Sequence, residues 1–525
     1  MDGTSTRRIV AALLAAVLLA VAGATAATAQ DQNPAAISAV EIPPGQIDAA
    51  IGQLDGLASG LMEETGIPGM AVAVVHDDRV VYAKGFGVRR LGDPTPIDPD
   101  TVFQLASVSK SVGATVVAGT VGRGVVSWND PVVRYLPWFK LKDRWTTRNV
   151  TIADLYSHRS GLPDHAGDDL EPLGWSRGQI LRRLRYEPLA PFRASYAYTN
   201  YGLTAAGIAV ARAARTSWAE LSERTIYRPL GMRSTSSRFA DYERAANRAT
   251  PHVLRDGRWT AVEPFDPDRE SPAGGVSSTV NDLAQWMRMM LADGVYDGRR
   301  IVDEAALMAM RTPHSVSQPP VTLDSRPGMY GLGINVGTDA SGRVFLGHSG
   351  AFEDGAATQV SMIPSAGLGI VILTNGEPMG VPETLAQTFL DLALVGHPTT
   401  DWWGLYGPAF EAAKQSPSPL AGKPRPANPR PARADRAYLG RWSSPYLGRA
   451  RIVRRDGHLV LIAGPARKQY VLTHWSGDTF TTGTGRLFGG VTFAGRDAQG
   501  RATRVTVESL DGEGTGLGTY RRVGG

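Results

Sequence analysis

The sequence predicts an α+β unit followed by a small all-β barrel or sandwich. Three observations favour this fold class. Strand-like runs lie near both ends of the first unit, with helical segments between them, which is typical of a sheet that joins the first and last parts of a domain. Residues 415–433 are rich in proline and contain no aromatic residue. After them, short strand-like runs are separated by glycine or aspartate.

Length and composition narrow the class of protein. The chain has 525 residues, of which 42% are hydrophobic and 20% are charged. This length allows at least one large core, and the apolar fraction excludes a mainly disordered protein. The absence of cysteine excludes disulfide bonds, thiolate zinc sites, iron–sulfur clusters and a cysteine nucleophile. The formal net charge of +5 is too small to indicate nucleic-acid binding.

Residues 1–29 predict a secretory signal peptide. Arg7 and Arg8 precede an uncharged run, and residues 27–29 (Ala-Thr-Ala) offer a cleavage site between small side chains. A retained membrane anchor is the alternative, because the uncharged run is nearly long enough to span a bilayer. Its weakly apolar second half favours cleavage. We therefore expect a periplasmic or secreted protein with no integral membrane segment after cleavage.

Hydrophobic periodicity gives the elements of the first unit, residues 30–398. An apolar run at 70–75 and an alternating run at 79–87 indicate paired strands. Small and apolar residues at helical spacing indicate a helix within 102–122. The other expected elements are helices at 151–155, 176–185, 203–213 and 279–292, and extended runs at 330–336, 342–346 and 358–374, the last broken at 364–367.

The C-terminal part is expected to be a linker and a β-domain. Residues 399–436 predict an extended linker, since six prolines lie between residues 415 and 433. Residues 437–525 predict the small barrel, with strands at 449–453, 458–462, 469–472, 479–482, 489–493 and 502–508. This unit carries 13 basic and 6 acidic side chains. The surplus indicates either a solvated surface or contact with an anionic cell wall or membrane.

The first candidate for chemistry is the segment Ser107-Val-Ser-Lys110. If a helix begins at Ser107, Lys110 lies one turn later on the same face, and the helix N-terminus offers free N–H groups that suit a developing oxyanion. To act as a base near neutral pH, Lys110 needs a pKa well below its usual value of about 10.4, which burial can supply. The alternative is that Ser107 only caps the helix and Lys110 reaches toward solvent.

The second candidate is the segment around Tyr198 and Asn200. Two residues apart in an extended segment, these side chains point the same way and place a phenol beside an amide. The phenol could relay a proton from Lys110 to a leaving group, and the amide could orient the lysine and the substrate. The alternative is an ordinary aromatic cluster that closes onto the helix at 203–213.

The third candidate is Gly347-His-Ser-Gly-Ala351, which resembles a Gly-x-Ser-x-Gly nucleophile elbow with Ser349 as nucleophile. An elbow must turn from a strand into a helix, but here a strand-like segment follows and Ala351 replaces the final glycine. We interpret the segment instead as a sheet edge, where His348 offers a polar side chain and Ala351 a backbone N–H. His158 is a weaker candidate for a base or ligand, and with Ser157 it is expected to be structural.

Together these segments resemble the serine β-lactamase and DD-peptidase superfamily, in its class C β-lactamase-like branch. The resemblance covers residues 40–396. It implies an all-α lobe beside an antiparallel sheet flanked by helices, with the site at their junction, and the β-domain resembles the tail of many such peptidases. The motifs that carry it are Gly66-Ile-Pro-Gly-Met, Ser107-Val-Ser-Lys110, Ser157-His-Arg-Ser-Gly-Leu162, Tyr198-Thr-Asn200, Pro272-Ala-Gly-Gly-Val-Ser-Ser278, Tyr330-Gly-Leu-Gly333, His348-Ser-Gly350 and Leu373-Thr-Asn-Gly376.

The resemblance also implies roles for individual residues. Ser107 is the acylated nucleophile, Lys110 and Tyr198 shuttle its proton, and Asn200 positions the substrate. The backbone N–H groups of Ser107 and Ala351 form the oxyanion hole. Whether Lys110 or a Tyr198 phenolate is the base stays open, because coupled groups share their titration. No metal or cofactor is implied.

One departure from penicillin-hydrolysing relatives concerns His348, which stands where those relatives usually have lysine. With Gly350 it forms a His-x-Gly motif on the substrate-binding edge, similar to D-aminopeptidases and esterases of this branch. Histidine is mostly neutral at pH 7, so it supplies no permanent cation for a β-lactam carboxylate. We therefore expect hydrolysis of peptides or esters, including peptides with D- or unusual residues, ahead of β-lactam hydrolysis.

Two further alternatives concern the whole protein. One is a non-hydrolysing receptor for wall peptides or penicillin, with the β-domain doing the binding. The other concerns the β-domain of an enzyme, which could pack on the catalytic lobe, form homo-oligomers or gate the substrate.

Overall fold

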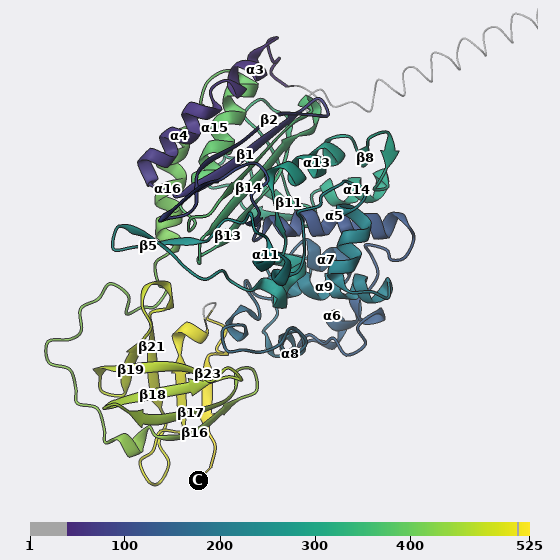
Figure 1. The fold of residues 1–525 in the computed structure, drawn as a ribbon. Coiled ribbons are helices and arrows are strands. Elements are labelled where there is room, and N and C mark those ends of the chain that lie inside the picture. The colour runs from purple at the N-terminus through teal and green to yellow at the C-terminus, as the bar shows by residue number, and fades with distance from the viewer. Residues whose placement is uncertain (1–38, 512–513, 525) are drawn as a thin grey trace, which may run out of the picture.

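The computed structural model describes residues 39–511 and 514–524. The predicted signal peptide therefore lies outside the described residues. Figure 1 shows two parts, a larger one that contains a sheet with its helices and a smaller β-barrel at the C-terminal end. Within the described ranges, every helix is too short or too polar to cross a bilayer.

A nine-stranded antiparallel sheet forms the centre of the larger part. Its order is β10-β11-β12-β13-β14-β15-β1-β2-β3, so the first strand of the chain lies between the last strand of the sheet and β2. This confirms the expected sheet that joins the first and last parts of the unit. The strands are β1 (Gly69–His76), β2 (Arg79–Arg90), β3 (Asp93–Pro96), β10 (Ser315–Gln318), β11 (Gly328–Tyr330), β12 (Asn335–Thr338), β13 (Val344–Phe352), β14 (Ala356–Ile363) and β15 (Leu368–Thr374).

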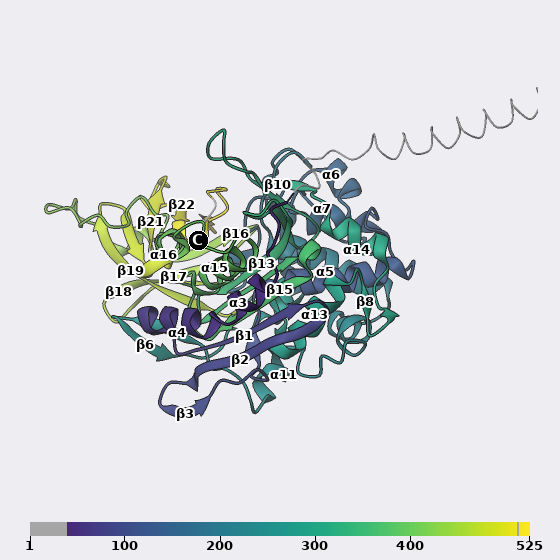
Figure 2. The ribbon, with the colours of Figure 1, turned by 90° about the horizontal axis from the view of Figure 1, so that it is seen from above.

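Both faces of the central strands are buried, which explains the unbroken apolar run in β1. Val72 and Val74 face a layer of helices on one side of the sheet, while Ala71 and Ala73 face the opposite core, because successive side chains of a strand alternate. The first layer consists of α3 (Gln46–Ile51), α4 (Leu54–Thr65), α15 (Val381–Val395) and α16 (Trp402–Ala413). Seen from above, α4 and α13 (Val280–Leu291) lie on opposite sides of β1 and β2 (Figure 2).

The all-α lobe adjoins the second face of the sheet. Its central helix is α5 (Val108–Gly122), whose residues 108–120 are all buried. A helix that is apolar and small on every side can pack against several neighbours at once, and α5 contacts α9, α12, α14 and the sheet. The remaining helices of this region are α6 (Arg144–Asn149), α7 (Ile152–Tyr156), α8 (Arg177–Arg183), α9 (Asn200–Ala213), α10 (Trp218–Ser222), α11 (Phe239–Arg244), α12 (Ser271–Gly274) and α14 (Glu304–Arg311).

Several boundaries differ from the expected ones. The helix expected within 102–122 begins at Val108, because β4 (Phe103–Gln104) pairs with β7 (Ser277–Ser278) first. The extended run expected at 330–336 is interrupted between β11 and β12, where Gly333 has a positive φ of 74°. In the range assigned to the linker, residues 402–413 form α16, which packs on α15.

The C-terminal strands close into an eight-stranded barrel, which confirms the expected small all-β fold. Strand β16 pairs with β23 to close it, and aromatic side chains such as Trp442, Phe480 and Tyr520 fill the interior. The strands are β16 (Gly440–Ser444), β17 (Gly448–Arg455), β18 (His458–Ala463), β19 (Lys468–Ser476), β20 (Thr479–Thr482), β21 (Gly489–Ala494), β22 (Arg504–Val507) and β23 (Thr519–Arg522).

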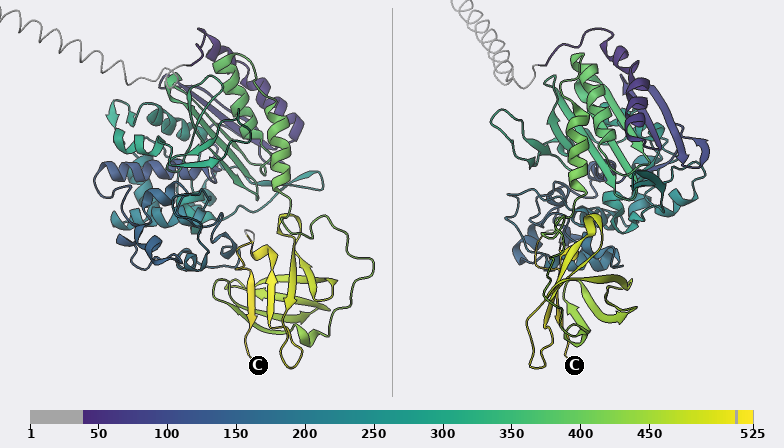
Figure 3. Two further views of the ribbon diagram at one scale, coloured as in Figure 1. Left: turned by 180° about the vertical axis from the view of Figure 1, so that it is seen from behind. Right: turned by 90° about the vertical axis from the view of Figure 1, so that its left-hand side faces the viewer.

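The barrel docks on the all-α lobe, below it in Figure 3. Arg183 lies 3.5 Å above the ring of Trp175, and its Nε donates to the carbonyl oxygen of Tyr446 at 2.8 Å. The backbone N–H of Ala466 donates to the carbonyl oxygen of Leu173 at 3.0 Å. Buried apolar residues run from the lobe into the barrel as one cluster. The two parts are therefore held by packing and hydrogen bonds in addition to the linker.

Candidate active site

Ser107 lies directly before the first turn of α5. Ala106 precedes it with a φ of 47°, a left-handed conformation that is uncommon for residues other than glycine and is found at functional turns. At this position the serine hydroxyl lies beside the free N–H groups and the positive end of the helix dipole. The local backbone therefore suits a nucleophile that must develop negative charge nearby.

Lys110 is completely buried one turn later in α5. Its Nζ donates to Ser107 Oγ at 3.0 Å, to Asn200 Oδ1 at 2.7 Å and to the carbonyl oxygen of Ala273 at 3.1 Å. Burial lowers the pKa of Lys110 to about 8, and the charge of Glu270 opposes this shift. The lysine can therefore hold a proton with three acceptors and lose it close to neutral pH.

Tyr198 contacts the same hydroxyl from the other side. Its Oη donates to Ser107 Oγ at 2.7 Å, and its ring centroid lies 4.5 Å from Lys110 Nζ. Burial raises the pKa of Tyr198 well above its usual value of 10, while the hydrogen bond with Ser107 works against that rise. The resting side chain is therefore a neutral phenol, able to donate its proton.

Asn200 is the first residue of α9, and its amide joins two parts of the site. Its Oδ1 accepts a hydrogen bond from Lys110 Nζ, and its Nδ2 donates to Asp168 Oδ2 at 2.9 Å. His165 Nδ1 lies 2.9 Å from the same carboxylate oxygen. The structure thus places Ser107, Lys110, Tyr198 and Asn200 in one hydrogen-bonded group. Sequence spacing predicts the two pairs, and the family resemblance implies that they meet.

Strand β13 runs past Ser107 at very short range. A Cβ at Gly350 would overlap the carbonyl oxygen of Leu105 and the hydroxyl of Thr358, and would lie 3.0 Å from the backbone nitrogen of Ser107. Only glycine permits this approach. Ala351, the next residue of the strand, is thereby carried to the same edge, where its N–H and that of Ser107 are predicted to bind the oxyanion.

His348 is buried, and both of its ring nitrogens have protein partners. Nδ1 lies 2.6 Å from the carbonyl oxygen of Ser349, and Nε2 lies 2.8 Å from Tyr330 Oη. These partners assign the proton to Nδ1 and make Nε2 the acceptor of the phenol. Burial, with the nearby charge of Lys110, lowers the pKa of His348 to about 3. The imidazole is neutral, and its direct contact with substrate stays a prediction.

Ser349 and His158 lie close to the site, and each bonds to a neighbouring structural element rather than to Ser107 Oγ. Ser349 lies in the middle of β13 and donates to Glu383 of α15, so no strand-to-helix elbow exists at this serine. His158 is buried, accepts the backbone N–H of Thr199 at 3.1 Å and packs its ring 4.6 Å from that of Tyr198. Ser157 Oγ donates within its own helix to Ala153. The structural roles expected for His158 and Ser157 fit these contacts.

A group of buried carboxyl groups lies beyond Lys110, and sequence reasoning missed it. Glu270 is 5% exposed, and its Oε2 has no hydrogen-bond partner among the described residues. Burial, followed by the charges of Glu171 and Asp168, raises the pKa of Glu270 well above its usual value. Glu171 accepts from Tyr201 Oη at 2.8 Å, and burial raises its pKa to about 7. No motif links these acids, so only the folded chain reveals them.

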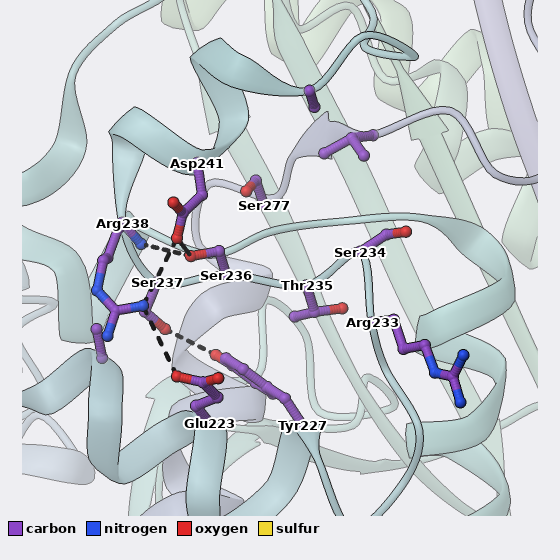
Figure 4. A pocket seen from close by; sticks show the side chains of 13 residues that line it. Glu223, Tyr227, Arg233, Ser234, Thr235, Ser236, Ser237, Arg238, Asp241 and Ser277 are labelled. Atoms are coloured by element: carbon purple, nitrogen blue, oxygen red, sulfur yellow. Dashed lines mark hydrogen bonds and ion pairs between the residues drawn. The ribbon is translucent and has the colours of Figure 1, made fainter.

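A separate pocket of about 380 Å³ lies on the all-α lobe (Figure 4). Arg238 spans it with ion pairs to Glu223 and Asp241, and Tyr227 bonds to Ser237 at 2.7 Å. None of the predicted catalytic side chains lines this pocket. It is therefore separate from the Ser107 site.

Comparison with known proteins identifies the family of the chain. The Beta-lactamase family model matches residues 54–394, and a domain of unknown function, DUF3471, matches residues 424–517. The chain is 30% identical to unguisins hydrolase ungD' of Aspergillus campestris, over 63% of this chain and 61% of that protein. It is 27% identical to esterase EstB of Burkholderia gladioli, over 68% and 98%. It is 23% identical to D-alanyl-D-alanine-carboxypeptidase/endopeptidase AmpH of Escherichia coli, over 65% and 87%.

The chain spans about 60% of the length of the first curated relatives that it matches. Among solved structures, the octameric penicillin-binding protein homologue from Pyrococcus abyssi aligns with a TM-score of 0.60 at 22% identity, over 87% of this chain and 97% of that one. This likeness supports the combined fold of sheet, lobe and barrel. With the family model covering well over half of its length, the chain belongs to the Beta-lactamase family.

Proposed function

We propose that this protein is an exported enzyme that hydrolyses amide or ester bonds of short peptides through a Ser107 acyl-enzyme. One observation carries the proposal: Lys110 Nζ and Tyr198 Oη both contact Ser107 Oγ, at 3.0 and 2.7 Å. A hydroxyl held between an amine and a phenol is an activated nucleophile with an adjacent proton donor.

Acylation begins when Lys110 is neutral. Ser107 Oγ attacks the substrate carbonyl and its proton passes to Lys110, while the N–H groups of Ser107 and Ala351 stabilise the oxyanion. The bond to the leaving amine or alcohol then breaks as Tyr198 gives that group its proton, and Tyr198 regains a proton from Lys110. Because burial raises the pKa of Tyr198, the lysine is the better resting base.

Deacylation reverses these roles. A water molecule attacks the carbonyl carbon of the Ser107 ester, and one of its protons passes to neutral Lys110 by way of Tyr198. The bond from the carbonyl carbon to Ser107 Oγ then breaks as Lys110 returns a proton through Tyr198 to Ser107 Oγ, which releases the carboxylic acid and restores the resting site. Asn200 holds the lysine through Oδ1 in both steps, and Asp168 keeps the amide from rotating. The same groups therefore act first as base and then as acid.

The choice of substrate rests on His348 and on the relatives. A neutral imidazole with both nitrogens engaged offers no cation for the carboxylate of a β-lactam, which favours ordinary amides and esters. The relatives named above include a hydrolase of unguisins, a peptidase and an esterase. Peptides with D- or unusual residues, including peptidoglycan-like ones, are therefore the first substrates to test.

Export to the periplasm or outside the cell rests on residues 1–29 alone. Self-association rests on the octameric homologue, and light scattering measures the mass in solution. A non-hydrolysing receptor is the alternative of another class: an indefinitely stable adduct on Ser107 would support it, and rapid turnover of that adduct would exclude it. Turnover of nitrocefin at a rate comparable to that of antibiotic-resistance enzymes would instead favour a β-lactamase.

The decisive experiment is labelling with a fluorophosphonate followed by peptide mass spectrometry. We expect one label on Ser107, none in Ser107→Ala, and unchanged labelling in Ser349→Ala, which removes the serine of the elbow-like motif. Labelling of Ser107→Ala to the same extent would contradict the proposal. Turnover of a panel of D- and L-aminoacyl amides and esters by wild type then defines the substrate class.

A further inference from the structure

A cavity of about 760 Å³ lies between the catalytic part and the barrel. Three parts of the chain line it: the loop with His165 and Asp168, the turn after β13 at Glu353, and the barrel at Arg486 and Glu508. The C-terminal residues of α16 and the start of the linker complete the lining. Its volume lies in the range of about 300–1,000 Å³ that is typical of small-molecule sites.

This cavity adjoins the catalytic group through two segments. Asp168 accepts from Asn200, which binds Lys110, and the backbone N–H of His165 donates to the carbonyl oxygen of Tyr198 at 2.7 Å. Glu353 follows Ala351 by two residues at the end of β13. A substrate that enters the Ser107 site therefore has this cavity as its neighbour.

The barrel wall of the cavity contacts both the catalytic part and the linker. Arg486 pairs with Glu353 at 2.7 Å, directly at the turn after β13, through side chains that are 51% and 63% exposed. Ser418 of the linker donates to Glu508 at 2.5 Å, which ties the linker to the barrel beside the cavity. The docking contacts of Trp175 and Arg183 with the barrel hold the rest of the interface. The wall is a built feature of the fold.

The lining carries an excess of negative charge. Among the described residues of the lining, the acidic ones are Asp168, Asp169, Glu353, Glu508 and Asp511, against the guanidinium of Arg486 and the ring of His165. In addition, the atoms Asp168 Oδ1 and Ser509 Oγ are shielded from solvent and lack a hydrogen-bond partner within the described ranges, although the Asp168 side chain as a whole is 29% exposed. A shielded polar atom is stabilised when a ligand or a water molecule bonds to it. A cation with N–H donors would bond to Asp168 Oδ1 and be attracted by the surrounding carboxylates.

We propose that this cavity is a substrate subsite for an ammonium or guanidinium group, closed on one side by the barrel. The inference rests on the proposed function and adds a substrate class to it: short peptides or esters with a cationic end or basic side chain a few atoms from the reacting carbonyl. It also gives the barrel a role, because its residues select the substrate while the catalytic part performs the reaction.

The test compares pairs of nitrophenyl esters and nitroanilides that differ only in a free or an acetylated amino group, with acyl chains of one and two residues. We expect a higher kcat/KM for the free amine in at least one pair. Arg486→Glu should raise this selectivity about two- to fivefold, and Glu508→Gln should lower it by a similar factor. Arg451→Glu is the control, since it makes the same charge reversal on an exposed position of β17 outside the cavity.

The outcomes separate a failure of the subsite from a failure of the proposed hydrolysis. Equal rates for free and acetylated substrates, or selectivity that neither cavity variant moves, would overturn the inference while Ser107 labelling leaves the proposed function intact. Failure of wild type to label at Ser107 would overturn the proposed function instead. Because Arg486→Glu also breaks the pair with Glu353, Arg486→Gln serves as a milder variant, and a smaller gain in selectivity is expected from it.

Discussion

At the scale of single residues, Lys110 should set the pH range of the proposed hydrolysis. The mechanism needs the neutral amine, and burial lowers the pKa of Lys110 to about 8. Below this value the lysine is protonated, so kcat/KM should rise about tenfold per pH unit until it levels off near pH 8. The measurement is kcat/KM for an uncharged ester between pH 5 and 9. A level rate from pH 5 upward would contradict a lysine base.

The variant Lys110→Arg keeps the positive charge but cannot lose its proton at these pH values. We expect kcat/KM to fall about 10²- to 10⁴-fold, which is the contribution typical of general base catalysis. Unchanged circular dichroism would show that the loss is chemical. Full activity of this variant would exclude proton transfer by Lys110.

A further prediction at this scale concerns Gly350. A side chain there would overlap Leu105 O and the Thr358 hydroxyl and push β13 away from Ser107. We expect Gly350→Ala to lose stability by about 1–3 kcal/mol, as overpacking does, and to lower kcat at the same time. Gly337→Ala on β12 is the control, because its Cβ would lie 3.7 Å from the nearest atom, in ordinary contact. Equal effects of the two substitutions would contradict this reading of the strand.

Site residues could be predicted from the sequence where their side chains are brought together by a short, regular spacing. Ser107 and Lys110 share a helix face, and Tyr198 and Asn200 alternate along an extended segment, so spacing alone placed each pair together. Asp168 and Glu270 had no such pattern. Their contacts join loops that lie far apart in the sequence, and nothing in the sequence marks them as buried.

At the scale of elements, α5 depends on small residues at defined positions. A Cβ at Gly119 would lie 2.6 Å from Thr225 Cγ2, whereas a Cβ at Gly56 of α4 would meet nothing within 4 Å. Gly56→Ala should stabilise the protein by about 0.5–1 kcal/mol, because alanine favours the helix. Gly119→Ala should destabilise it through the clash. Denaturant unfolding of both variants measures the difference, and an equal gain at both positions would contradict the packing of α5.

Some strands were predicted from the sequence and others were missed, and the extent of their burial explains the difference. β1 and β15 are buried on both faces and stand out as apolar runs. The barrel strands β16 and β23 were missed because one is Gly-Arg-Trp-Ser-Ser and the other Thr-Tyr-Arg-Arg, each with few apolar residues. Their pairing with each other closes the barrel, and this long-range contact leaves no local signal.

At the scale of the whole molecule, Trp175 is central to the docking of the barrel. Its ring lies beneath Arg183 and against Gly448, where a Cβ would be 2.5 Å from the indole. Trp175→Ala should loosen the interface and increase the radius of gyration in small-angle scattering. Trp145→Ala, which removes an indole that is 59% exposed, is the control and should leave that radius unchanged. An equal radius for the two variants would mean that other contacts hold the barrel.

The α+β unit, the proline-rich segment and the small barrel were all evident in the sequence. Their mutual placement was not, since the interface joins residues near 175 to residues near 446 without a shared motif. The cavity between the two parts was hidden from sequence reasoning for the same reason.

The position of β1 has a consequence for how this protein is made. β1 pairs with β15, so Met70 lies opposite Thr374. Contacts between such distant segments fold slowly, because a long loop must close first. During synthesis, the apolar β1 therefore emerges from the ribosome some three hundred residues before its partner strand. Until that strand arrives, one edge of the apolar β1 has no partner and is open to aggregation, and a product that ends before residue 368 lacks the strand that joins β1 to the rest of the sheet.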